Sequence, residues 1–186
     1  VLRQLKGKKG TTVKVGIFRR GVHGLIKYTI TRDVIPTYSL DVSYVVKPGT
    51  GYIRLNNFSA TTHDEIHDAL SKLNSTGLKK LILDLRGNGG GYLKAAIDVA
   101  DEFLPENKLI VYTEGTHHPK EVASSSRDGL FEKGDLVVMI DEFSASASEI
   151  VAGALQDNDR GEIIGRRSFG KGLVQEQLDF KDGSAI

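Results

Sequence analysis

The chain has 186 residues, of which 39% are hydrophobic and 26% charged; this composition fits one or two globular domains and excludes a disordered or collagen-like protein. Lys and Arg total 25 against 24 Asp and Glu, and the net charge of +1 gives no electrostatic reason to expect a nucleic-acid partner or an acidic membrane. The absence of cysteine excludes disulfides, thiol nucleophiles and thiolate metal sites, and no apolar run nears the ~20 residues that span a bilayer.

The first 35 residues predict a small β module. Residues 11–17 and 25–31 are rich in β-branched side chains and flank a glycine-containing turn, so they predict two paired strands. Two or three strands are too few to form a stable core alone. The sequence also opens without an initiator methionine or an apolar leader. We therefore expect a fragment whose first 35 residues are the end of a truncated β domain.

The following residues, 36–186, predict an α/β unit, because strand-like and helix-like segments alternate along them. We expect an exposed, mobile loop over residues 114–129 and a hairpin-like segment from Leu173. The strands at 80–85 and 136–141 are continuous apolar runs, which is typical of a mostly parallel, buried sheet. The predicted strands cover residues 51–55, 80–85, 109–112, 136–141 and 162–165, and the predicted helices cover residues 63–75, 93–103 and 146–156.

Three loops follow strands of this sheet: residues 86–91, 141–146 and 170–172. Open α/β sheets bind ligands at the carboxyl ends of their strands, so these loops are the candidate site. The segment S-A-S-A-S-E at residues 144–149 places hydroxyls at the start of a helix, where backbone amides can stabilise an oxyanion. The alternative is that its serines only cap the helix.

A nucleophilic serine needs a base, and the five histidines all fall in segments away from the three loops. Lys171, between Gly170 and Gly172, is the better candidate, because a lysine removed from water can act as a general base. An ordinary surface lysine in a turn is the alternative. The loop 86–91 is rich in glycine and offers free amides for an oxyanion or a phosphate, but it is neither a dinucleotide fingerprint nor a P-loop.

His63 and His67 lie four residues apart on a predicted helix, a spacing that also occurs in zinc sites. The acid order differs from that of the zinc-protease motif, since Asp64 directly follows the first histidine and Glu65 comes next. A third ligand is not evident nearby in the sequence. We therefore favour a solvated helix face, and expect neither a metal nor a cofactor.

Three segments together resemble the carboxy-terminal processing, or tail-specific, proteases: residues 83–91, residues 144–157, and a G-(x)3-F-G-K-G-(x)2-Q pattern at residues 165–175. The resemblance implies a ClpP/crotonase-like α/β core at 36–186, incomplete at its C-terminal end. It also implies that residues 1–35 are the C-terminal remnant of a PDZ domain. Members of this family are serine peptidases that use a Ser–Lys dyad.

Carried over by position, the resemblance implies that Ser146 is the nucleophile and that Lys171, 25 residues later, is the base. Gln175 matches a residue that orients the lysine in some members, and Asp157 matches an acid implicated in others. The oxyanion donors implied are the amides of Ala147 and Gly90. The chain departs from the family pattern at Gly89, where many members have proline, and at Phe143, where glycine is common.

The expected function is cleavage of protein substrates with exposed C-termini, near that end, through an acyl-enzyme. One alternative is a catalytically silent peptide-binding or scaffold fragment of the same fold; another is a crotonase-like acyl-CoA enzyme, which leaves the Ser–Lys spacing unexplained. The resemblance suggests an exported bacterial protein, periplasmic or membrane-associated. The expected partners are protein or peptide substrates, not nucleic acid, and the oligomeric state is not predicted.

Overall fold

The computed structural model describes residues 2–33, 38–126, 128–175 and 178–186. The chain divides into two compact units, Val1–Thr37 and Tyr38–Ile186. The domain boundary expected between residues 35 and 36 falls within residues 34–37, outside the described residues.

The N-terminal unit is a two-stranded ribbon with one helical turn. Strands β1 (Thr12–Ile17) and β2 (Ile26–Thr31) pair antiparallel, as predicted, and the short helix α1 (Leu2–Leu5) precedes them. The guanidinium of Arg32 ties these parts together by donating to the carbonyls of Leu5 (2.8 Å) and Gln4 (3.0 Å). Most strand side chains are exposed, because a ribbon has no second layer to bury them.

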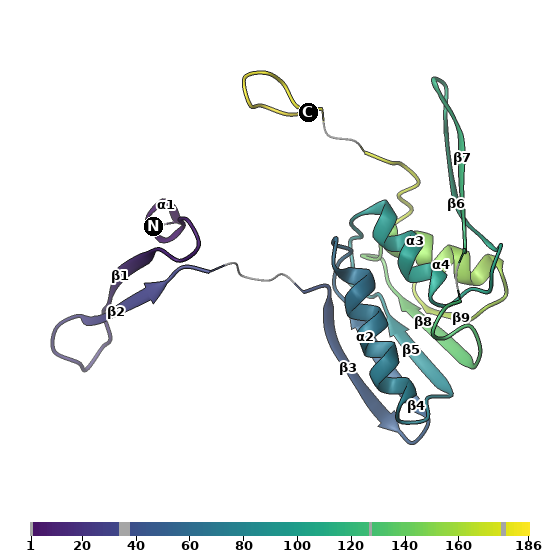
Figure 1. Ribbon diagram of the computed structural model, residues 1–186, viewed down its shortest axis with the longest axis horizontal. Helices are drawn as coiled ribbons and strands as arrows, with labels where there is room; N and C mark the ends of the chain where they lie inside the picture. The colour runs from purple at the N-terminus through teal and green to yellow at the C-terminus, as the bar shows by residue number, and fades with distance from the viewer. Residues whose placement is uncertain (1, 34–37, 127, 176–177) are drawn as a thin grey trace. The chain divides into compact units, whose positions relative to one another are not determined.

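The second unit is built on a five-stranded sheet with the order β3-β4-β5-β8-β9 (Figure 1). The strands β4, β5, β8 and β9 are parallel, and only β3 runs antiparallel, as the hairpin partner of β4. This confirms the α/β class with a mostly parallel sheet. The bounds are Leu40–Lys47 for β3, Thr50–Leu55 for β4, Lys80–Asp84 for β5, Asp135–Ile140 for β8 and Glu162–Gly165 for β9.

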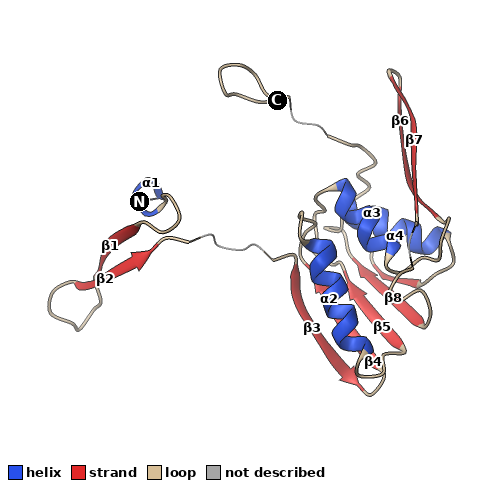
Figure 2. Cartoon of the chain, in the orientation of Figure 1, coloured by secondary structure: helices blue, strands red, loops and turns tan. Residues whose placement is uncertain are grey.

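Three helices pack on one face of this sheet: α2 (Thr62–Asn74), α3 (Leu93–Asp101) and α4 (Ala147–Asp157) (Figure 2). The parallel strands follow one another across the sheet in chain order, and right-handed crossovers then put every connecting helix on the same side. Each helix buries an apolar face, such as Ile66 and Leu70 of α2 or Val151 and Leu155 of α4. The core between helices and sheet includes Leu83, Phe103 and Val138, all fully buried.

The strands differ from the sequence prediction in two places. Strand β3 was not predicted, although residues 40–44 alternate apolar and polar and Gly49 allows a tight hairpin to β4. The strand predicted at 109–112 is confirmed as β6 (Leu109–Gly115). It pairs with β7 (His118–Ser124), which lies where a mobile loop was expected, and the two form a hairpin separate from the five-stranded sheet. The polar side chains of this segment are typical of a loop, and the hairpin is held together by backbone pairing between its two strands.

The C-terminal segment past β9 contains no strand among its described residues. The hairpin-like structure expected from Leu173 is limited to one bridge, between Asp179 and Ala185. No helix in the described part of the chain has the length and apolar character needed to cross a membrane.

Candidate active site

The three predicted loops lie at one edge of the sheet, because β5, β8 and β9 are neighbouring parallel strands. Hydrogen bonds join the loops directly. The amide of Gly87 donates to Asp141 Oδ1 (2.9 Å), and the amide of Ala145 donates to the carbonyl of Asn88 (3.0 Å). The amide of Phe169 donates to the carbonyl of Ser144 (3.0 Å), which connects the lysine-bearing loop to the serine loop.

The serine segment uses two of its three hydroxyls for structure. Ser144 Oγ donates to the carbonyl of Leu85 (2.8 Å), and Ser148 Oγ donates to the carbonyl of Asn88 (2.9 Å). Both side chains are fully buried, whereas Ser146 is partly exposed. The structure therefore separates two structural serines from one, Ser146, that faces the surface at the start of α4.

The backbone at Ser146 is strained. Its φ of 54° and ψ of −113° lie in a region that residues with a side chain rarely occupy. Ser146 is the N-cap residue of α4 and forms a capping box with Glu149, so it does cap the helix; N-cap residues normally have extended backbone angles, however, and capping alone does not require this conformation. Strain of this kind costs about 1–3 kcal/mol and clusters at functional sites.

The glycine-rich loop lies against this serine. A Cβ at Gly90 would be 2.6 Å from the carbonyl oxygen of Ala145 and 2.8 Å from Ser146 Cβ, and the φ of 97° also requires glycine. The Gly90 amide donates to Asn88 Oδ1 (2.9 Å), while Asn88 Nδ2 donates to the carbonyl of Leu55 (3.0 Å). Asn88 is thus a buried clamp on the loop, a role the sequence did not reveal.

Glu149 connects the nucleophile segment to the lysine loop. Its Oε2 accepts the amides of Ser146 (2.8 Å) and Lys171 (2.9 Å), and its Oε1 accepts the amide of Gly170 (2.6 Å) and the hydroxyl of Ser168 (2.7 Å). Burial alone raises the pKa of Glu149, but these four donors outweigh burial and lower it. Glu149 is therefore an anion that fixes both segments, and sequence reasoning assigned it no role.

Lys171 lies on this tethered loop, with its Nζ directed to Gln175. Lys171 Nζ donates to Gln175 Oε1 (2.5 Å). Among the hydrogen bonds of the described residues, none joins Lys171 Nζ to Ser146 Oγ. The structure thus brings the loop of Lys171 to the serine segment while the amine itself contacts glutamine.

Asp157 is the last residue of α4, so the helix length separates it from Ser146 by about 16 Å along the axis. Its side chain is exposed and lies outside the assembled loops.

An ion pair at the end of β5 supports the glycine-rich loop. Asp84 is fully buried and accepts the Tyr52 hydroxyl (2.6 Å) and two guanidinium nitrogens of Arg86 (2.7 and 2.9 Å). Burial raises the pKa of Asp84, but the hydrogen bonds from Arg86 and Tyr52 outweigh it and lower the pKa. Beside this pair is a pocket of about 390 Å³ whose lining includes Arg54, Arg86 and Arg166.

Comparison with proteins of known sequence identifies relatives of the chain. The chain is 40% identical over 189 residues to a carboxyl-terminal-processing protease of Synechocystis, covering 98% of this chain and 43% of that protein. It is 38% identical to the carboxy-terminal processing protease CtpA of Bacillus subtilis, covering 98% of this chain and 38% of the relative. The chain therefore spans about two fifths of the length of these relatives.

The chain also shares its fold with solved structures of proteases. The photosystem II D1 C-terminal processing protease superposes with a TM-score of 0.70 at 30% identity, covering 96% of this chain and 50% of that one. A putative S41 protease from Bacteroides fragilis shares the fold at a TM-score of 0.67 and 17% identity, over 91% of this chain and 50% of the other. The sequence model of peptidase family S41 matches residues 49–186, and the chain belongs to this family of serine-type peptidases.

Proposed function

We propose that the protein is a serine endopeptidase that cleaves protein substrates near their C-terminus with Ser146 as nucleophile and Lys171 as general base. The observation that carries the proposal is the strained backbone of Ser146 at the start of α4, on the segment that Glu149 ties to the loop of Lys171. The printed names of the relatives, carboxyl-terminal-processing proteases, support the substrate class.

In this mechanism Lys171 Nζ removes the proton from Ser146 Oγ as the oxygen attacks a peptide carbonyl. The protonated Lys171 then gives this proton to the nitrogen of the leaving amine as the peptide C–N bond breaks and the acyl-enzyme forms. Neutral Lys171 next accepts a proton from the water that attacks the acyl carbonyl, and returns it to Ser146 Oγ as the new C-terminal carboxylate leaves. Lys171 first has to exchange its hydrogen bond to Gln175 for one to the serine, so Gln175 holds the amine close to the site until substrate arrives. Neither Asp157 nor a metal takes part in this sequence of steps.

The oxyanion of the tetrahedral intermediate is assigned to the amides of Ala147 and Gly90. The Ala147 amide lies at the start of α4, and no acceptor is recorded for it among the described residues. The Gly90 amide has Asn88 Oδ1 as its acceptor, so it either shares its hydrogen with the oxyanion or releases Asn88. Each donor is worth roughly 3 kcal/mol of transition-state stabilisation.

The proposal extends to the N-terminal unit and to the location of the protein in the cell. Residues 1–33 supply two antiparallel strands, as the end of a PDZ domain would, and that domain would recruit substrate C-termini. The named relatives are bacterial carboxy-terminal processing proteases, and the resemblance to that family suggests an exported protein, periplasmic or associated with the membrane.

A second candidate function is a catalytically silent peptide-binding fragment of the same fold. It is favoured by one observation, the contact of Lys171 Nζ with Gln175 in place of Ser146. In this alternative the site binds peptide without forming an acyl-enzyme.

The test is covalent labelling with a fluorophosphonate probe, followed by a peptidase assay of the full-length protein. We expect a single label on Ser146, lost in Ser146→Ala, and a drop in kcat of at least about 10⁴-fold for that variant. Ser144→Ala is the matched control, since its hydroxyl donates to a backbone carbonyl. Labelling of the parent that persists in Ser146→Ala contradicts the assignment; no labelling of the full-length protein favours the silent fragment.

A further inference from the structure

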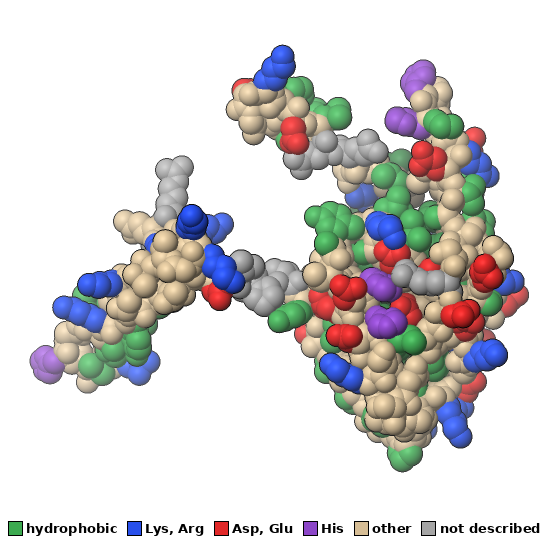
Figure 3. Space-filling model, in the orientation of Figure 1, with side chains coloured by type: hydrophobic (Ala, Val, Ile, Leu, Met, Phe, Trp, Pro, Cys, Tyr) green, Lys and Arg blue, Asp and Glu red, His purple; other side chains and the backbone are tan. Residues whose placement is uncertain are grey.

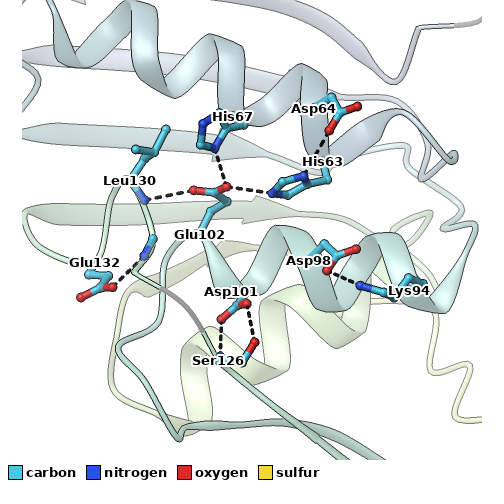
Figure 4. Close-up of polar contacts among 11 residues, drawn as sticks. His63, Asp64, His67, Lys94, Asp98, Asp101, Glu102, Ser126, Leu130 and Glu132 are labelled. Atoms are coloured by element: carbon cyan, nitrogen blue, oxygen red, sulfur yellow. Dashed lines mark hydrogen bonds and ion pairs between the residues drawn. The ribbon is translucent and has the colours of Figure 1, made fainter.

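Two histidines of α2 meet a buried carboxylate that follows α3 (Figure 4). His63 Nε2 lies 2.9 Å and His67 Nδ1 lies 2.8 Å from the same oxygen, Glu102 Oε1. The three donor atoms lie within 4.8 Å of one another. Glu102 comes 35 residues after His67 in the sequence, so only the fold brings the third group to the pair.

The carboxylate of Glu102 is held in place from behind. Its side chain is 3% exposed, and its second oxygen accepts the amide of Leu130 (3.0 Å). Oε1 is therefore directed at the histidines. Because the supporting contact comes from the backbone, this orientation does not depend on the two imidazoles.

The histidines themselves are arranged as ligands of a metal often are. Positions four residues apart lie on one face of a helix, and the two ring centroids are 5.8 Å apart. His63 Nδ1, the nitrogen directed away from Glu102, lies 3.3 Å from Asp64 Oδ1. A carboxylate that accepts from the second ring nitrogen is the usual partner of a metal-bound histidine, where it fixes the tautomer.

The distances fit a small divalent ion after a small adjustment. Ligand atoms about 2.1 Å from a tetrahedral zinc ion are about 3.4 Å apart, so the two nitrogen–oxygen distances have to widen by roughly 0.5 Å. The histidine side chains are 23% and 47% exposed and can rotate by this amount, and water can reach the remaining coordination position. Figure 3 shows histidine side chains at the surface of the α/β unit with acidic side chains around them, which favours a cation.

We propose that His63 Nε2, His67 Nδ1 and Glu102 Oε1 form a binding site for a divalent transition metal of the zinc type. Two imidazoles and one carboxylate suit zinc, nickel or copper ions and disfavour calcium or magnesium, which prefer oxygen ligands. The bound ion joins the start of α2 to the end of α3 and to the loop of Leu130. Helix α3 separates Glu102 from the glycine-rich loop of the candidate active site. The role of the ion is therefore structural: it braces α2 against α3.

The competing explanation is an ion pair in which the histidines only neutralise Glu102. Calorimetric titration of the metal-free full chain, without an affinity tag, with zinc chloride alone distinguishes the two. We expect one ion per chain, and we expect His63→Ala and His67→Ala each to weaken binding at least tenfold. Cobalt(II) provides a second readout, because the bound ion has a visible absorption that depends on its ligands.

The matched control is the double variant His117→Ala, His118→Ala, which removes the two exposed histidines at the tip of the β6–β7 hairpin. This variant should bind zinc like the parent. Zinc should also raise the Tm of the parent and the control, and not that of His67→Ala. No stoichiometric binding, or equal binding by the parent and His67→Ala, overturns the proposal and leaves the ion pair. His67 is exposed and His63 is partly exposed, so we expect their alanine variants to fold even where a variant of the buried Glu102 does not.

Discussion

The nucleophile side and the base side of the candidate site are built differently. On the nucleophile side, Ser144 and Asn88 are fully buried. Hydrogen bonds join the serine segment to the carbonyls of Leu85 and Asn88. Lys171 lies on a largely exposed segment that is fixed chiefly through the carboxylate of Glu149 and the amide of Phe169.

This difference indicates where each part of the site gets its precision. The conformation of Ser146 is held by packing, and the core would have to open to release it. The position of Lys171 depends on a few hydrogen bonds near solvent, which break at a low free-energy cost. The nucleophile side is therefore preformed, and the base side is the part that substrate or a neighbouring segment can adjust.

The largest expected effect on stability comes from Gly90→Ala, on the nucleophile side. The new Cβ would meet the Ala145 carbonyl oxygen at 2.6 Å, at a φ of 97°. We expect a loss of about 3 kcal/mol in unfolding free energy and a fall in kcat of about 10³-fold, measured by urea denaturation and peptidase assay. The control is Gly89→Ala, where no atom lies within 4 Å of the added Cβ. If Gly90→Ala behaves like Gly89→Ala, the close approach of the two loops is not required.

An intermediate effect is expected from Glu149→Gln, which weakens the connection between the two sides. An amide nitrogen in place of one carboxylate oxygen leaves amide donors of Ser146, Gly170 or Lys171 without an acceptor. We expect kcat/KM to fall by about 10–100-fold, the equivalent of about 1.5–3 kcal/mol. Glu142→Gln is the control, since that exposed carboxylate accepts a hydrogen bond from Arg166 Nε (2.6 Å). Equal losses in both variants would contradict the role of Glu149.

The same residue predicts a pH dependence of stability. The pKa of Glu149 is lowered in the folded protein, so its contribution to stability is complete above the ordinary glutamate value of about 4.3 and is lost as the pH falls through the lower folded-state value. The difference in unfolding free energy between the parent and Glu149→Gln should therefore be largest near pH 7 and shrink below about pH 4. A difference that is constant with pH would show that the charge of Glu149 is not what matters.

The smallest effect on stability is expected from Ser146→Gly, in which the unfolding free energy reports the strain. Glycine tolerates the backbone angles of this residue, so relief of about 1–3 kcal/mol of strain should exceed the added entropy of the unfolded chain. We expect unfolding free energy to rise by about 1 kcal/mol while activity is lost. Ser148→Gly should be destabilising, because its hydroxyl binds the Asn88 carbonyl inside a helix. A destabilised Ser146→Gly would mean that the backbone angles carry no strain.

The sequence by itself determined the class of fold and the position of the three loops. Apolar runs such as residues 80–85 and the amphipathic faces of the three helices follow local periodicity, and the carboxyl-end rule then places the loops at one edge. The motifs also singled out Ser146 and Lys171. The local patterns did not predict strand β3 or the pairing of β6 with β7, because the composition of a strand does not identify the strand it pairs with.

Only the tertiary structure decided which groups meet across long separations in the chain. The burial of Ser144 and Ser148, the clamp of Asn88 on Gly90, and the four donors to Glu149 depend on backbone atoms brought together by the sheet. The meeting of Glu102 with His63 and His67 depends in the same way on the packing of α2 beside α3. Local sequence patterns indicate which face of a helix or strand is buried. Hydrogen bonds between distant loops depend instead on the packing of the whole unit. These contacts therefore could not be predicted from the sequence.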